Sequence, residues 1–256
     1  CRLLGLVANK EVDLKFSLIE GPKTLRTLSQ YNEDGWGLGW YEKDKPVIVK
    51  EPAPAHSSQK YETAAAEARS RIFVAHVRKA TTGSRKKENC HPFQYNRWLF
   101  AHNGTVCRES LLKLLDEAHR SGIVGETDSE VYFHWILQNI EDSSSPKEGI
   151  AFALSALKSS GIAYTGLNFL LTDGEHLYAY RNNGGLFYLI RKPGRRQPET
   201  LRSKQVRVML ESKSLQGEEA ILVCSERLTE EGWQEIRSGY LLVVGPGLNL
   251  DITDLR

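Results

Sequence analysis

The chain has 256 residues and a mass of 28.9 kDa, which is enough to bury a substantial core. Hydrophobic residues make up 40% and charged residues 26%, as in an ordinary soluble globular protein. The formal net charge of +2 argues against nucleic acid or a membrane surface as the main partner. No apolar run is long enough to span a bilayer, and the start of the chain does not resemble a signal peptide. We therefore expect a cytoplasmic protein whose four scattered cysteines are reduced.

The first part of the chain predicts mainly strands. Apolar stretches rich in β-branched and aromatic residues favour extended structure. An alanine-rich stretch preceded by Ser57 and Ser58 favours a helix that one of these serines caps. The expected strands are 1–8, 36–43, 46–51, 71–78 and 97–104, and the expected helices are 24–32 and 57–70.

Helices are expected in the middle of the chain and strands in its last third. Thr127 and Glu130 fit a capping box, which places Asp128 in the first turn of a helix. The expected helices are 108–120, 127–141 and 145–161. A hairpin is expected over 166–182 with its turn at Asp173-Gly174, followed by strands 185–192, 205–210, 219–226 and 239–246. No Gly/Ser-rich linker or internal repeat divides the chain, so we expect a single α+β domain over 1–256.

Cys1 combines a thiol and an α-amine on one residue. A free thiol has a pKa near 8.5 and needs a base to become a good nucleophile, and an α-amine with a pKa of about 7.7–8.0 can serve as that base. Such a residue can attack a carbonyl without any histidine. The alternative is that the numbering simply begins at an ordinary cysteine.

Three further sites carry groups that suit a small polar substrate. Arg78 ends a strand beside Thr81 and Thr82 and could bind a carboxylate, although a surface ion pair is the commoner role of a lone arginine. Asn103-Gly104 could form an oxyanion hole, or simply a tight turn. Asp128 could bind an ammonium group, or merely complement the helix dipole.

Two other patterns give weaker indications. The glycines of "DGWGLGWY" do not have the spacing of a dinucleotide fingerprint, and a strand follows them rather than a helix. Cys90, His91, His102 and Cys107 suggest zinc, but their spacing does not fit a zinc site. We therefore expect neither a metal nor an organic cofactor.

Taken together, these motifs form a recognisable order. It runs from Cys1 through D-G-x-G, H-x-R-x-A-T-x-G, H-P and H-N-G to E-T-D-S-E. This order resembles class II glutamine amidotransferase domains of the N-terminal-nucleophile (Ntn) hydrolase superfamily, over roughly residues 1–130. Within this class, the chain is similar to the stand-alone group that includes YafJ, EgtC and Dug3, in its opening "CRLLG", in "DGWGLGWY" and in the later "CSERLT". Arg227 stands where that group has proline.

The resemblance implies a four-layer αββα sandwich with two mostly antiparallel sheets. It also implies that Cys1 is the nucleophile and its own α-amine the base, with Asn103 and Gly104 holding the oxyanion. Arg78 would bind the substrate carboxylate, with Thr81 and Thr82 nearby, and Asp128 would bind its ammonium group. Gly37, Trp36 and His91 would shape the pocket. Lys79 and Thr82 replace the tryptophan and histidine of many fused members, which favours a more open pocket or a larger γ-glutamyl substrate.

The expected substrate is a small molecule, either glutamine or a γ-glutamyl amide, attacked by Cys1 to form a thioester. Two versions of the enzyme stay open: one passes ammonia to a partner enzyme, and the other simply hydrolyses a γ-glutamyl conjugate. A non-catalytic binding or assembly protein that keeps the glutamine pocket is the third alternative.

Overall fold

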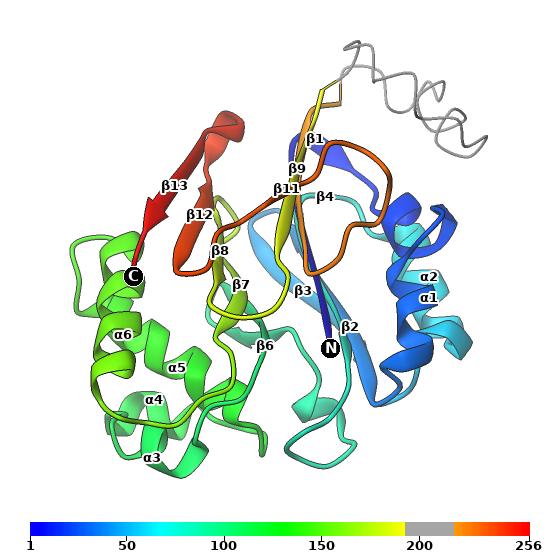
Figure 1. Ribbon diagram of the computed structural model, residues 1–256. Coiled ribbons are helices and arrows are strands. Elements are labelled where there is room, and N and C mark those ends of the chain that lie inside the picture. Colours follow the sequence, from blue (N-terminus) through cyan, green and yellow to red (C-terminus); the bar gives the residue numbers. More distant parts are fainter. Residues whose placement is uncertain (193–217) are drawn as a thin grey trace.

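The computed structural model describes residues 1–192 and 218–256, which form two antiparallel β-sheets lying between two groups of helices (Figure 1). The strand expected over 205–210 lies outside the described residues. The first sheet has the strand order β11-β9-β10-β1-β4-β2-β3. Its strands are β1 (Arg2–Val12), β2 (Gly35–Glu42), β3 (Lys45–Glu51), β4 (Ser70–Arg78), β9 (Phe187–Arg191), β10 (Ala220–Cys224) and β11 (Gln234–Glu235).

The second sheet has the order β13-β12-β8-β7-β6-β5. Its strands are β5 (Phe93–Tyr95), β6 (Trp98–Asn103), β7 (Asn168–Thr172), β8 (Leu177–Arg181), β12 (Tyr240–Val244) and β13 (Leu250–Asp254). β7 and β8 form the hairpin expected over 166–182, and Gly174 in its turn has a φ of +92°. β5, β11 and β13 are not predicted from the sequence, and each of them lies at the edge of its sheet.

Helices cover the outer face of each sheet, so the fold has the expected four layers (Figure 1). α1 (Leu25–Leu28) and α2 (Gln59–Glu67) pack on the first sheet, and α5 (Asp128–Glu141) and α6 (Pro146–Ser159) on the second. Between residues 108 and 121 the chain forms α3 (Arg108–Leu112) and α4 (Glu117–Ser121). Among the described residues, no helix has both the length and the apolar character needed to cross a membrane.

Helix ends follow the local signals in most places. Ser58, one of the two expected serines, caps α2, and Ser145 caps α6 with Pro146 at its first position. The single helix expected over 108–120 is wrong, because the Asp116 side chain accepts the N–H of His119 and starts a second helix there. Helix 24–32 is likewise an α-helical turn followed by a 3₁₀ turn over Ser29–Tyr31.

The capping box at α5 forms only in part. Thr127 accepts the backbone N–H of Glu130, as expected. The Glu130 carboxylate, however, accepts the N–H groups of Val124 and Gly125 instead of returning to Thr127. Asp128 is nevertheless the first residue of the helix, where the sequence predicts it.

The alternation of β1 explains how the sheets stack. Leu4 and Leu6 point to the core under α1 and α2, whereas Leu3 and Val7 point to the core between the sheets. Because both faces are buried, the strand appears in the sequence as an unbroken apolar run. A Cβ on Gly5 would lie 2.9 Å from Leu177, so a glycine here lets the sheets approach closely.

The contact between the sheets should dominate stability. Leu170 on β7 is fully buried in that core, so Leu170→Ala should lower the free energy of unfolding by about 2–5 kcal/mol in chemical denaturation. Phe152 on α6 is 62% exposed, and Phe152→Ala serves as the control with a change of less than about 0.5 kcal/mol. Equal losses for the two variants would contradict this assignment of the core.

Candidate active site

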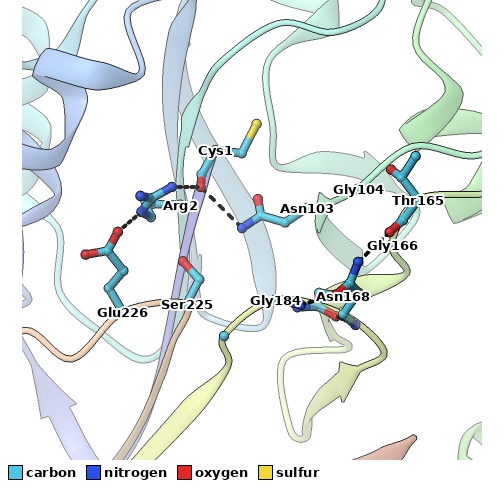
Figure 2. Close-up of a pocket in the computed structure, with 12 residues that line it drawn as sticks. Cys1, Arg2, Asn103, Gly104, Thr165, Gly166, Asn168, Gly184, Ser225 and Glu226 are labelled. Atoms are coloured by element: carbon cyan, nitrogen blue, oxygen red, sulfur yellow. Dashed lines mark hydrogen bonds and ion pairs between the residues drawn. The ribbon is translucent and has the colours of Figure 1, made fainter. Parts of the chain in front are cut away.

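One cavity of about 450 Å³ opens where the ends of the two sheets meet (Figure 2). It lies between the start of β1, the end of β6, the segment before β7, the turn after β8 and the end of β10. Its lining is almost entirely polar or glycine: Cys1, Arg2, Asn103, Gly104, Thr165, Gly166, Asn168, Asn183, Gly184, Gly185, Ser225 and Glu226. Both sheets therefore supply its walls.

The thiol of Cys1 is half-buried at the edge of this cavity. Its Sγ lies 3.3 Å from the backbone N of Lys79 and 3.3 Å from the Lys79 carbonyl oxygen. Pairing of β1 with β4 in register, Arg2 opposite Val77, places Cys1 beside the end of β4. In Figure 2 the sulfur points away from the Arg2–Glu226 ion pair, which lies at the other side of the residue.

The α-amine of Cys1 is held by a residue that the sequence analysis did not identify. It donates to Oδ1 of Asn32 at 2.7 Å. Burial, followed by the positive charges of Arg2 and Lys79, lowers the pKa of this amine from 8.0 to about 5, against the opposing effect of Asp34 and Glu226. At neutral pH the amine is therefore unprotonated and can accept a proton.

Asn103 and Gly104 lie next to Cys1, as the motif predicts. The Nδ2 of Asn103 donates to the Cys1 carbonyl oxygen at 3.4 Å, a long hydrogen bond. Gly104 has a φ of +148°, and a Cβ there would lie 2.0 Å from the carbonyl oxygen of Gly166. Only glycine fits at this position, which brings the backbone to the cavity wall.

A buried histidine behind Asn103 sets the direction of its amide. The Nε2 of His76 lies 3.1 Å from Oδ1 of Asn103. Burial, followed by the charge of the Cys1 amine, lowers the pKa of His76 well below its usual value, so the ring is neutral. An amide oxygen can only accept, so Nε2 of His76 carries the hydrogen and Nδ2 of Asn103 faces Cys1.

His91 packs against His76 rather than lining the cavity. The two ring centroids are 4.2 Å apart, and neither ring nitrogen of His91 has a hydrogen-bond partner among the described residues. A Cβ on Gly37 would lie 2.0 Å from the His91 carbonyl oxygen. Trp36 is fully buried beneath α2, where it meets the ring of Tyr61 edge-on. The structure thus places these three predicted pocket residues behind the site.

Arg78 and Asp128 are joined to each other through one loop. The guanidinium of Arg78, which is almost fully buried, donates to the carbonyl oxygens of Thr82, Gly83 and Ser84. Asp128 accepts from the Thr82 hydroxyl and, at 2.8 Å, from the N–H of Val106. Thr81 is exposed on the same loop. The structure brings Arg78, Thr82 and Asp128 together, while their roles in substrate binding stay predictions.

Two acidic residues outside the predicted set fix this loop. Asp34 accepts the N–H of Ala80 at 2.8 Å and pairs with Arg85. Glu126 accepts from Ser84, Lys86 and Asn89. The hydrogen bond from Lys86, with those from Ser84 and Asn89, holds the pKa of Glu126 far below its usual value. In the sequence, only the position of Asp34 in the motif E-D-G and of Glu126 in the motif E-T-D could have indicated this role.

No metal centre is formed by the part of the chain described here. Residues 1–192 and 218–256 contain no group of three or more His, Cys, Asp or Glu side chains arranged to hold an ion. Cys90 donates its S–H toward the Glu51 and Lys86 carbonyl oxygens, and His102 bonds to Ser129 and the Gly166 carbonyl oxygen. These residues have structural partners.

Comparison with known proteins identifies the same architecture. Residues 1–254 match the family model of class II glutamine amidotransferases. The putative glutamine amidotransferase YafJ of Escherichia coli is 30% identical, over 93% of this chain and 95% of its own length. The gamma-glutamyl-hercynylcysteine sulfoxide hydrolase of Mycobacterium tuberculosis is 32% identical over 43% of this chain and 52% of its own.

A solved structure shares the fold along its whole length. The glutamine aminotransferase class-II domain protein of Silicibacter pomeroyi superimposes with a TM-score of 0.67 at 23% identity, covering 99% of both chains. The two antiparallel sheets and their covering helices therefore have the Ntn-hydrolase arrangement that the motifs imply.

The amine of Cys1 should titrate far below an ordinary α-amine. We expect the rate of its acylation, followed by mass spectrometry of the N-terminal peptide, to be half-maximal near pH 5 in the folded protein, against about 8.0 in an unfolded peptide. Between these values the unfolded chain binds more protons, so this group makes the fold less stable as the pH falls from about 8 to about 5. A half-maximal rate near pH 8 in the folded protein would refute the low pKa.

Proposed function

The chain belongs to the class II glutamine amidotransferase family, and from this premise we propose that it hydrolyses a γ-glutamyl amide through a thioester on Cys1. The observation that carries the proposal is that a thiol, an unprotonated amine and the amide of Asn103 meet at one cavity. These are the nucleophile, base and oxyanion donor that acyl transfer requires.

The proposed reaction begins with proton transfer from the Cys1 thiol to its own α-amine. The sulfur then bonds to the γ-carbonyl carbon, and the oxyanion receives hydrogen bonds from Nδ2 of Asn103 and the N–H of Gly104. The α-ammonium returns its proton to the leaving amine as the C–N bond breaks. Water, deprotonated by the same amine, attacks the thioester and releases glutamate with the regenerated thiol.

The γ-glutamyl half of the substrate is assigned to the loop side of Cys1. Arg78 would bind its α-carboxylate and Asp128 its α-ammonium, with Thr81 and Thr82 beside them. The charges support this assignment, because the two buried groups have opposite sign and are already linked through Thr82. Gly37, Trp36 and His91 would act only by supporting the walls.

The leaving half of the substrate is assigned to the cavity. Ammonia is about as large as a water molecule, which needs only about 10–15 Å³ of cavity volume, whereas this cavity measures about 450 Å³. A cavity of this size favours a γ-glutamyl conjugate whose amine part is a substantial molecule. The gamma-glutamyl hydrolase among the relatives supports the same conclusion. Passage of ammonia to a partner enzyme remains the second version of the reaction.

Cys1 should be indispensable for turnover. Cys1→Ser should abolish hydrolysis and the trapping of a γ-glutamyl thioester by mass spectrometry, because the hydroxyl is a far poorer nucleophile. Cys107 is a half-buried cysteine that is hydrogen-bonded to Ser110, and it supplies the matched control: Cys107→Ser should keep full activity. A form with one residue added ahead of Cys1 should be as inactive as Cys1→Ser. Full activity of that form would exclude the α-amine as base, and absence of turnover and thioester from the unaltered protein would favour the non-catalytic alternative.

The cavity predicts which amide is preferred. We expect kcat/KM for γ-glutamylglycine to exceed that for glutamine by about tenfold or more, because the larger leaving group gains contacts in the cavity. The α-linked isomer, with the same atoms, should not be cleaved. Preference for glutamine over every conjugate tested would favour the ammonia-donating version instead.

A further inference from the structure

Asn32 is the only described residue whose side chain accepts a hydrogen bond from the Cys1 α-amine. It is 2% exposed and follows the 3₁₀ turn Ser29–Tyr31, before β2 begins at Gly35. Its partner is 31 positions away in the chain, so nothing in the local sequence announces the contact. The donor–acceptor distance of 2.7 Å makes it a short hydrogen bond for a nitrogen donor.

The orientation of the Asn32 amide is fixed by a second hydrogen bond. Its Nδ2 donates to the Leu28 carbonyl oxygen at 2.7 Å, and its backbone N–H donates to the Ser29 carbonyl oxygen. The helical turn that supplies these carbonyls is itself held by the reciprocal hydrogen bonds of Thr24 and Thr27. Because Nδ2 is engaged, Oδ1 must face the amine.

A neutral acceptor suits a base that gains and loses a proton in every cycle. The Asn32 oxygen can accept an N–H from the free amine and from the ammonium alike, so the nitrogen keeps its position while its charge changes. A carboxylate at the same place would stabilise the ammonium and raise the pKa of the amine, so that less of it would be free to act as a base at neutral pH. The amide thus holds the amine without protonating it.

The other charges around the amine come from four elements. Arg2 on β1 and Lys79 after β4 oppose protonation, while Asp34 before β2 and Glu226 after β10 favour it. Asp34 and Glu226 are each paired with arginine, Glu226 also with Lys23. Asn32 lies in direct contact with the amine and adds no charge to this set.

The segment that carries Asn32 also fixes the surroundings of the thiol. Two residues later, Asp34 donates its backbone N–H to the Arg78 carbonyl oxygen and accepts the N–H of Ala80. These bonds hold the backbone of Lys79, which contacts Sγ of Cys1. One short segment therefore sets the position of both the base and the nucleophile.

We propose that Asn32 is a positioning residue for the reaction, which holds the α-amine of Cys1 in place through a neutral acceptor. The proposal rests on the proposed function, in which this amine is the base. In this proposal the chemistry of the Asn32 side chain matters as well as its size, because an amide is needed where a carboxylate would not serve. Asn32 touches no substrate atom in this scheme and acts only through Cys1.

The test compares Asn32→Asp with Asn32→Ala in the full chain. In Asn32→Asp the acid limb of the kcat/KM profile should move upward by about 1–3 pH units. In Asn32→Ala the limb should stay near its original pH, while kcat falls about 10–100-fold because the base is no longer held in place. Asn249 is exposed in the turn between β12 and β13, and Asn249→Asp is the matched control. It should change neither the acid limb of kcat/KM nor kcat.

A measurement without turnover separates this proposal from the proposed function. In a Cys1→Ser background, the pH dependence of amine acylation should shift upward by the same about 1–3 units on adding Asn32→Asp. If this shift is seen but the unaltered protein has no activity, the proposed function is rejected, while the contact between Asn32 and the Cys1 amine is supported. An unmoved titration in folded protein, checked by thermal unfolding, would overturn the role of Asn32. If Asn32→Asp fails to fold, unchanged kcat in Asn32→Ala would overturn it as well.

Discussion

Pairing of β1 with β4 on one side and β10 on the other is the constraint on which the site depends. Because β1 lies between these strands, its first residue emerges where their ends meet the ends of β6 and β7 from the second sheet. The apolar residues of β1 are buried on both faces, so a one-residue shift of register would exchange them between the two cores, bring a leucine to the narrow place of Gly5 and displace Cys1. Stability and placement of the thiol therefore rest on the same hydrogen bonds.

Neutral polar groups surround Cys1 where charged ones would be expected to act. Asn32 accepts from its amine, Asn103 faces its carbonyl, and the neutral ring of His76 orients Asn103. Of the charged residues nearby, Arg2 also donates to the Cys1 carbonyl oxygen, at 2.8 Å, and pairs with Glu226, while Asp34 pairs with Arg85. Burial is then the largest influence on the pKa of the amine, and it favours the unprotonated form.

The fold class and the central residues could be predicted, because motif order and the apolar runs are properties of the sequence itself. Cys1, Asn103 and Gly104 do meet at a cavity, and Asp128 does begin its helix. Asn32 stands outside every motif, and its contact with Cys1, 31 positions away, arises from tertiary packing alone. His76 opens the motif H-x-R, but the motif does not show that its ring meets Asn103. The place of Trp36 behind the cavity could not be predicted for a related reason: a strand has two faces, and its sequence does not tell which one meets the pocket.

The loop between β4 and α5 has a consequence for how a substrate could bind. Arg78 already donates to three carbonyl oxygens of its own loop, and Asp128 already accepts from Thr82 and Val106. A carboxylate and an ammonium group would thus meet charges whose desolvation and orientation are settled before binding, which lowers the cost of binding. Lys79, which contacts the Cys1 sulfur, lies between Arg78 and Ala80, and the N–H of Ala80 donates to Asp34, so the groups assigned to the substrate and the contact with the thiol belong to one hydrogen-bonded segment.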